Sequence, residues 1–307
     1  MRPRVGKMQK LNRSGKSRTK KEFNFPYAIK SFIGYLEGTE KSAHTIKNYR
    51  LDVQSFQDFL SHGLQQGPGS KPVTLEKIDP SDLERFHNYL KAQGLKTNTR
   101  RRKLLTVGRF LSYLVNRNKL PEELGRKVPT PHKIERVPFT VSSSALVALI
   151  QALPTDTLLD QRNRLLLWTL AETGCQVSEL SHLRYDNWQG SGANATLRIL
   201  GKAERTLAVS GGLAQAVEDF RARVQPKEGT PWVFLGFNKF GSLGGAISPR
   251  GVELLVKHFG PKLKLGELTP RTFRHSAVIG WHQGGLSREE IQRRLGLKTS
   301  YAFRAYE

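Results

Sequence analysis

The first third of the chain carries apolar residues at the spacing of an α-helix. After Ser42 they recur at steps of three and four, at Ile46, Tyr49, Val53, Phe56, Phe59 and Leu60. This spacing places them on one helix face, which must pack against a partner because it is apolar. A helix over Tyr27–Glu37, a third that starts at Asp79-Pro80-Ser81 and a fourth that Thr97 caps complete a predicted four-helix domain.

Beyond residue 140 the pattern predicts helices that alternate with two short strands. The strands are expected over Ala195–Leu200 and Arg205–Val209, on either side of a turn at Gly201-Lys202. Helices are expected over Ser142–Leu153, Asp160–Glu172, Ser178–Leu183, Leu213–Val224, Pro249–Phe259, Arg274–Gln283 and Arg288–Leu295. The predicted fold class is therefore mainly α-helical, with a small antiparallel sheet in the second domain.

Composition indicates where the domains begin and end. Residues 1–24 hold nine Lys or Arg and one acidic residue, which predicts a disordered basic arm. The arm either binds phosphates or is a solvated tail, and the sequence leaves both open. A stretch with Pro and Lys within 121–140 predicts a linker between a helical domain at 25–120 and an α-rich domain at 141–307.

The balance of charge limits the possible partners. The 307 residues include 50 Lys and Arg against 26 Asp and Glu, a formal net charge of +24. So strong a positive field attracts polyanions, of which nucleic acid and anionic membranes are candidates. No apolar run approaches the roughly 18 residues of a membrane-spanning helix. The charge therefore favours nucleic acid and indicates neither a membrane nor a small-molecule substrate.

Cysteine and histidine give no sign of a disulfide or a metal site. Cys175 is the only cysteine, and no Cys and His residues have zinc-site spacing. No apolar stretch follows the basic N-terminus, as it would in a secretory signal. We expect a cytoplasmic protein that uses no metal ion and no other cofactor.

Three segments, in order, resemble the tyrosine recombinase family, which includes phage integrases and Xer recombinases. They are LAETGCQVSELSHLR (Leu170–Arg184), LRILGKAERTLAV (Leu197–Val209) and TPRTFRHS (Thr269–Ser276) followed by IQRRLGL (Ile291–Leu297) and Tyr306. Upstream, Ser42–Arg50 with Phe56 and Phe59 is similar to the family's helical core-binding domain. The resemblance implies a core-binding (SAM-like) domain and a catalytic domain that form a C-shaped clamp around double-stranded DNA.

The resemblance also implies roles for individual residues in metal-free cleavage of one DNA strand. Tyr306 corresponds to the nucleophile that forms a 3′-phosphotyrosyl intermediate, although Tyr301 is a rival in the same segment. Lys202 corresponds to the lysine that protonates the leaving 5′-oxygen. Arg274 corresponds to an arginine that holds a phosphate oxygen through its forked donors. Of Arg274 and the adjacent His275, one is expected to have a structural role.

Three positions depart from the family's pattern. Gln176 stands where the family has its first arginine, and an amide cannot neutralise a phosphorane. Arg271 replaces a histidine that exchanges protons, which a guanidinium cannot do near neutral pH, although it can supply a replacement cation. Leu297 removes a further hydrogen-bond donor. The chain also ends one residue after Tyr306, where the family continues into a segment that docks on a neighbouring protomer.

Several basic residues outside these segments are candidate phosphate contacts. They are Arg100, Arg101, Arg102 and Lys103 in the first turn of the fourth helix, and Arg250 near the start of a later helix. The positive end of a helix disfavours cations, so phosphate contact would explain the basic first turn. A solvated charged face is the alternative.

Two functions stay open. The first is a recombinase or integrase that acts in site-specific DNA recombination or integration with weakened activity, and that assembles on DNA with further copies of itself or with a related recombinase. The second is a catalytically inactive recombinase-fold protein with an architectural or regulatory role on DNA. A third hypothesis, a general basic nucleic-acid binder, requires the ordered resemblance to be accidental.

Overall fold

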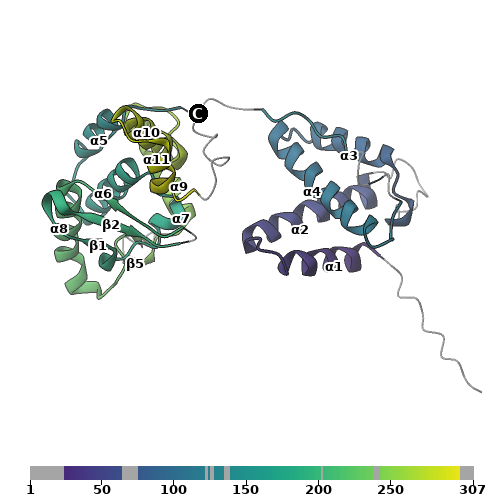
Figure 1. The fold of residues 1–307 in the computed structure, drawn as a ribbon, viewed down its shortest axis with the longest axis horizontal. Helices are drawn as coiled ribbons and strands as arrows, with labels where there is room; N and C mark the ends of the chain where they lie inside the picture. Colours follow the sequence, from purple (N-terminus) through teal and green to yellow (C-terminus); the bar gives the residue numbers. More distant parts are fainter. Residues whose placement is uncertain are drawn as a thin grey trace, which may run out of the picture. The chain divides into compact units, whose positions relative to one another are not determined.

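The computed structural model describes residues 24–63, 75–121, 124, 128–134, 139–201, 203–237 and 243–297. They form two compact units, one that ends at Arg136 and one that begins at Val137 (Figure 1). Of the predicted basic arm, residues 1–23 lie outside the described residues. Each unit has a hydrophobic core of its own.

Unit 1 contains the four helices that the apolar spacing predicts. They are α1 (Phe25–Glu37), α2 (Ala43–Asp58), α3 (Pro80–Ala92) and α4 (Thr97–Val115), with a π-helical turn at Phe59–Gly63 and a 3-10 turn at Leu75–Lys77. The side chains of Ser42 and Asp79 cap α2 and α3 by accepting hydrogen bonds from backbone N–H groups. Thr97 is not the cap of α4 but its first residue, and its hydroxyl accepts a hydrogen bond from Arg100.

Aromatic rings fill the centre of unit 1. The rings of Phe56 and Phe86 meet edge to face at 5.0 Å between centroids, and those of Phe32 and Phe110 do so at 5.4 Å. Leu124, which falls within the range predicted as a linker, is also buried in this core. The segment after α4 therefore contributes to the packing of unit 1.

A buried carboxylate joins α2 to α4. Asp52 is 1% exposed and accepts hydrogen bonds from Arg102 and, at 3.2 Å, from the Thr106 hydroxyl. The ammonium of Lys103 lies 3.5 Å from the same carboxylate. A buried charge is tolerated only with such partners, so these contacts fix α2 against α4.

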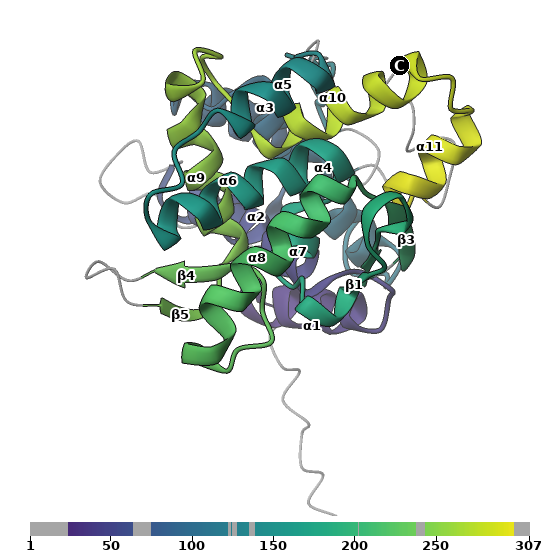
Figure 2. The ribbon, with the colours of Figure 1, turned by 90° about the vertical axis from the view of Figure 1, so that its left-hand side faces the viewer.

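Helix α6 (Leu158–Thr173) lies in the middle of unit 2 and is buried along most of its length. Helices α5 (Ser143–Gln151), α8 (Gly211–Glu228) and α10 (Pro270–Gln283) pack around it, as Figure 2 shows. The remaining helices are α7 (Val177–Leu180), α9 (Pro249–Lys262) and α11 (Arg288–Leu295), with 3-10 turns at Tyr185–Asn187 and Gly192–Asn194.

Two small antiparallel sheets complete unit 2 among the described residues. The first has the order β1 (Trp188–Gln189), β2 (Thr196–Ile199), β3 (Arg205–Ala208), with Leu197 opposite Leu207. The second pairs β4 (Leu235–Phe237) with β5 (Leu243–Ala246). Strands β2 and β3 were predicted, whereas β1, β4 and β5 were not. The Leu-Gly-Gly-Ala sequence of β5 lacks β-branched or aromatic residues.

Helix α10 begins four residues earlier than predicted. Its first residue is Pro270 rather than Arg274, and the Thr269 side chain accepts a hydrogen bond from the Thr272 N–H. A threonine cap followed by proline at the first helical position is a typical helix start. As a consequence Arg271 and Arg274 lie one turn apart on the same helix. Within the described ranges, no helix is long and apolar enough to cross a membrane.

We predict that Asp52→Asn destabilises unit 1 selectively. The amide cannot accept from Arg102 as the carboxylate does, so we expect unit 1 to lose about 1–3 kcal/mol of unfolding free energy. Hydrogen exchange of α2 and α4 amides in the intact protein measures this loss. Tryptophan fluorescence reports unit 2 alone, because all four tryptophans lie there, at positions 168, 188, 232 and 281.

The exposed Glu84 on α3 provides the matched control for this substitution. Glu84→Gln removes a charge of the same sign without breaking a buried contact, so it should leave exchange unchanged. Equal exchange in Asp52→Asn and Glu84→Gln would contradict the role assigned to Asp52.

Candidate active site

The turn between α6 and α7 positions Gln176. Gly174 ends α6 with a positive φ of 57°, and a Cβ at this position would lie 3.2 Å from the Cβ of Ala277 on α10. Gln176 is the N-cap of α7; its backbone N–H donates to the Glu179 carboxylate at 2.7 Å and its side chain is exposed. The only polar group it offers outward is a neutral amide.

Arg274 is buried and connects three helices. Its side chain extends from α10, donates to the Gly174 carbonyl at 2.8 Å and donates to the Leu295 carbonyl at 2.7 Å. The residue is 7% exposed. Gly174 ends α6 and Leu295 ends α11, so one guanidinium binds the C-terminal ends of both helices, where carbonyls lack intrahelical partners.

Arg271 and His275 form a hydrogen-bonded pair on α10. The Arg271 Nε donates to the His275 Nε2 at 3.1 Å, and Arg271 as a residue is exposed. Burial, together with the positive charges of Arg271 and Arg274, lowers the pKa of His275 to about 4. His275 is therefore neutral near pH 7, which leaves its Nε2 able to accept from Arg271.

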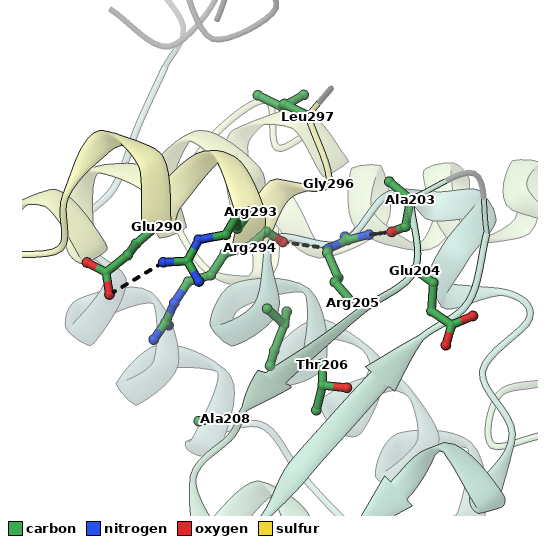
Figure 3. Close-up of a pocket in the computed structure, with 11 residues that line it drawn as sticks. Ala203, Glu204, Arg205, Thr206, Ala208, Glu290, Arg293, Arg294, Gly296 and Leu297 are labelled. Atoms are coloured by element: carbon green, nitrogen blue, oxygen red, sulfur yellow. Dashed lines mark hydrogen bonds and ion pairs between the residues drawn. The ribbon is translucent and has the colours of Figure 1, made fainter. Parts of the chain in front are cut away.

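A buried ion pair joins β3 to α7 and α11. Arg205 donates from Nη1 and Nη2 to the two carboxylate oxygens of Glu179, at 2.7 and 2.9 Å. Its Nε donates to the Arg294 carbonyl at 2.6 Å, and Figure 3 shows the guanidinium between α11 and the Ala203 carbonyl. The side chains of Arg205 and Glu179 are 7% and 13% exposed.

Leu297 lies at the end of α11 beside a groove. It packs against a small apolar cluster formed by α10 and α11, which includes Val278, Ile291 and Leu295. The groove between β3 and α11 has a volume of about 520 Å³, and Leu297, Arg293 and Arg294 contribute to its wall. An apolar side chain thus fills the position where the sequence comparison expects a hydrogen-bond donor.

Two family models match this chain. The model of the phage integrase N-terminal SAM-like domain matches residues 29–118, and the phage integrase family model matches residues 140–307. The second match alone covers more than half of the chain. The chain belongs to the phage integrase family of tyrosine recombinases. Its two units thus correspond to the family's N-terminal SAM-like domain and its catalytic domain.

Curated relatives resemble this family member over most of its length. It is 28% identical over 278 residues to tyrosine recombinase XerC of Herpetosiphon aurantiacus, covering 87% of this chain and 86% of that one. It is 25% identical over 281 residues to tyrosine recombinase XerC of Anoxybacillus flavithermus, covering 89% and 90%.

Solved structures share the fold at lower identity. A XerH site-specific recombinase bound to its difH substrate matches with a TM-score of 0.66 at 17% identity, covering 85% of this chain and 76% of that one. A lambda integrase dimer bound to a COC′ core site matches with a TM-score of 0.65 at 12% identity, covering 92% and 77%.

The structure brings together only part of the predicted catalytic set of this integrase-family chain. Arg274 contacts the turn that precedes Gln176, and Arg271 lies one helical turn from Arg274. Lys202, Tyr306 and the rival Tyr301 lie outside the described residues. Their roles therefore stay predictions that rest on the sequence.

Most predicted phosphate contacts of unit 1 have partners within the protein. Arg102 and Lys103 share Asp52, while Arg101 donates to the Pro131 carbonyl at 2.8 Å. In unit 2 the exposed Arg250 forms an ion pair with Glu253 at 2.9 Å, in the first turn of α9. Their proposed phosphate contacts stay predictions.

Sequence reasoning missed Glu179 and Arg205, although both lie inside segments that carry the family resemblance. Each had a local signal. Glu179 lies three residues after the cap Gln176, as in a capping box, and Arg205 lies on the same face of its strand as the apolar Leu207. Their pairing across the fold could not be predicted from spacing alone.

Cys175 is a buried thiol in this integrase fold. It is 1% exposed, and burial raises the pKa of its thiol to about 11, so it is not a thiolate near neutral pH. Within the described ranges no group of three or more His, Cys, Asp or Glu residues could hold a metal ion.

We predict that His275 makes the stability of unit 2 fall in mild acid. Its pKa of about 4 in the folded state lies below the unfolded value of about 6.5. Below pH 6.5 the unfolded chain therefore binds a proton that the folded chain does not. The unfolding free energy of unit 2 is therefore unaffected by His275 protonation above pH 6.5, and it falls by on the order of 3 kcal/mol by pH 4.

Denaturation followed by tryptophan fluorescence at several pH values measures this effect. His275→Gln should flatten the dependence of unfolding free energy on pH between 6.5 and 4, whatever it does to stability at pH 7. His282→Gln, an exposed position on the same helix, is the control. Parallel pH profiles for the protein and for His275→Gln would contradict the prediction.

Proposed function

We propose that this protein binds double-stranded DNA and exchanges its strands in site-specific recombination or integration, through a 3′-phosphotyrosyl intermediate on Tyr306. Membership of the phage integrase family supports this proposal, as do the tyrosine recombinase names of its relatives. Two structures with the same fold are recombinases bound to DNA substrates. The formal net charge of +24 also suits a polyanion.

The observation that carries the proposal is the exposed guanidinium of Arg271 beside buried Arg274. Arg271 uses its Nε to donate to His275, and within the described ranges its terminal nitrogens make no hydrogen bond. Those nitrogens are available for a phosphate oxygen. Arg271 can therefore supply the positive charge that Gln176 lacks.

The proposed step forms one bond and breaks one. The phenol oxygen of Tyr306 bonds to phosphorus while its proton passes to solvent water. The phosphorus–O5′ bond breaks, and Lys202 gives a proton to the leaving 5′-oxygen. Arg271 and Arg274 stabilise the charge on the non-bridging oxygens. Because Arg271 cannot accept the phenol proton as a histidine would, we expect slow cleavage.

Duplex binding is proposed to involve both units. Arg100, Arg101, Arg102 and Lys103 of unit 1 and Arg250 of unit 2 would contact phosphates of the duplex. Assembly of several copies, or of this protein with a related recombinase, is proposed for the DNA-bound state. The lambda integrase neighbour, whose structure is a dimer on its core site, supports this part of the proposal.

A second candidate function is DNA binding without cleavage. Two observations favour it: the neutral, exposed amide of Gln176, and the packing of Leu297 in an apolar cluster. Such a protein would occupy or shape a DNA site, or regulate an active recombinase there. Both candidates require duplex binding, so covalent chemistry distinguishes them.

We predict that the protein forms a covalent adduct with a nicked duplex. Cleavage near the nick releases a short fragment that diffuses away, so the strand cannot be rejoined and the adduct accumulates. The duplex comes from genomic fragments selected by binding, and the adduct is detected on a denaturing gel. Tyr306→Phe should abolish it, because phenylalanine has no oxygen to attack phosphorus. Arg271→Gln should slow its formation by about 10²-fold to 10³-fold, and Gln176→Arg should speed it.

Tyr301→Phe is the matched control for the nucleophile and should leave the adduct intact. Loss of the adduct with Tyr301→Phe but not with Tyr306→Phe would reassign the nucleophile. Tight binding without any adduct would overturn cleavage and support the second candidate. Rescue of such a protein by Gln176→Arg would locate its defect at that position.

A further inference from the structure

Arg205 contacts three separate segments of unit 2 through one guanidinium. It donates to Glu179 on α7, to the Arg294 carbonyl on α11 and, at 3.2 Å, to the Ala203 carbonyl in the β2–β3 turn. With a second bond to Glu179, these contacts use Nε, Nη1 and Nη2, so all three nitrogens of the side chain donate. A lysine has a single nitrogen and cannot reach these acceptors together.

The contact with Glu179 extends to Gln176. The Glu179 Oε2 accepts both from the Arg205 Nη2, at 2.9 Å, and from the Gln176 backbone N–H, at 2.7 Å. Gln176 begins α7, so the position of this turn depends on a carboxylate that Arg205 holds. Both side chains of the ion pair are largely buried, which strengthens the interaction relative to an exposed pair.

The contact with α11 determines where the chain leaves this helix. Arg205 and Arg274 donate to adjacent carbonyls, those of Arg294 and Leu295. Gly296 then turns the chain with a φ of 64°, and a Cβ at Gly296 would lie 2.9 Å from the Arg205 Nη1. The positive φ favours glycine here, and any larger residue would also displace the Arg205 guanidinium. The segment that starts here contains Tyr306.

In the β2–β3 turn, Arg205 binds the residue that follows Lys202. Ala203, whose carbonyl accepts from Arg205, directly follows Lys202 in the sequence. Figure 3 shows this carbonyl and that of Arg294 on opposite sides of the guanidinium. The Arg205 side chain therefore links the backbone next to Lys202, the proposed acid, to the end of α11, which precedes the segment with the proposed nucleophile Tyr306.

We propose that Arg205 is a positioning residue that couples the β2–β3 turn to the end of α11 and to the α7 turn. This inference rests on the proposed function. Arg205 touches no reacting atom; it orients the backbone from which Lys202 and the Tyr306 segment extend. Its loss should therefore slow the step that needs the proton of Lys202 more than it weakens DNA binding.

A duplex with sulfur in place of the leaving 5′-oxygen provides the decisive readout. A thiolate leaves without being protonated, so its departure does not need a positioned Lys202. Arg205→Lys should slow single-turnover cleavage of the oxygen duplex by about 100-fold, the size of a general-acid contribution. The sulfur duplex should lose much less. Equal losses on both duplexes would mean that Arg205 has only a structural role and would overturn the proposal.

Arg198 provides the matched control on the neighbouring strand. It too is a hairpin arginine paired with a glutamate, Glu204, at 2.6 Å, but both side chains are 51% exposed. Arg198→Lys should cleave both duplexes at the rate of the unaltered protein. Glu179→Gln, which leaves Arg205 in place but weakens the pair, should reproduce part of the effect of Arg205→Lys.

Hydrogen exchange tests the coupling independently of catalysis. In Arg205→Lys, the amides of Gln176, Gly296 and Leu297 should all exchange faster, while amides in the middle of α6 should not. Faster exchange confined to β3 would overturn the coupling. A protein that cleaves neither duplex would overturn the proposed function, and exchange would still decide whether Arg205 links the three segments.

Discussion

The arrangement of the site depends on the burial of two guanidinium groups. A buried arginine is stable only if its N–H donors find acceptors. Arg274 and Arg205 meet this requirement with the carbonyls of Gly174, Leu295 and Arg294 and the carboxylate of Glu179. Carbonyls at helix C-termini also lack partners, so each contact satisfies both sides. The ends of α6 and α11, the start of α7 and the strand β3 are thereby held together.

The two arginines of α10 differ in exposure. Arg274 is 7% exposed, whereas Arg271 on the same face of α10 is exposed. His275, which follows Arg274 in the sequence, stays neutral near pH 7 because burial and both guanidinium groups lower its pKa. The neutral imidazole then accepts from Arg271 and orients it. Under the proposed function, the exposed guanidinium of Arg271 supplies positive charge near Gln176, but it cannot exchange protons as a histidine would, since a guanidinium stays protonated.

Regular local patterns allowed much of the fold to be predicted. Apolar spacing was sufficient for α1 to α4, and the turn at Gly201 was sufficient for β2 and β3, because these signals depend on neighbours in sequence. The start of α10 was placed too late although Thr269-Pro270 is a typical cap. The hairpin of β4 and β5 was missed, because glycine-rich strands owe their conformation to pairing rather than to propensity.

For the candidate site too, some features could be read from the sequence and others depended on the tertiary structure. The sequence alone identified the departures from the family's motifs at Gln176, Arg271 and Leu297. It also determined the excess of positive charge and the family. Tertiary structure decided which groups are buried and which face outward: Arg205 pairs with Glu179 across 26 positions, and Arg274 reaches back 100 positions to Gly174. No local pattern predicts such contacts, because they form only when packing brings distant helix ends within hydrogen-bond distance.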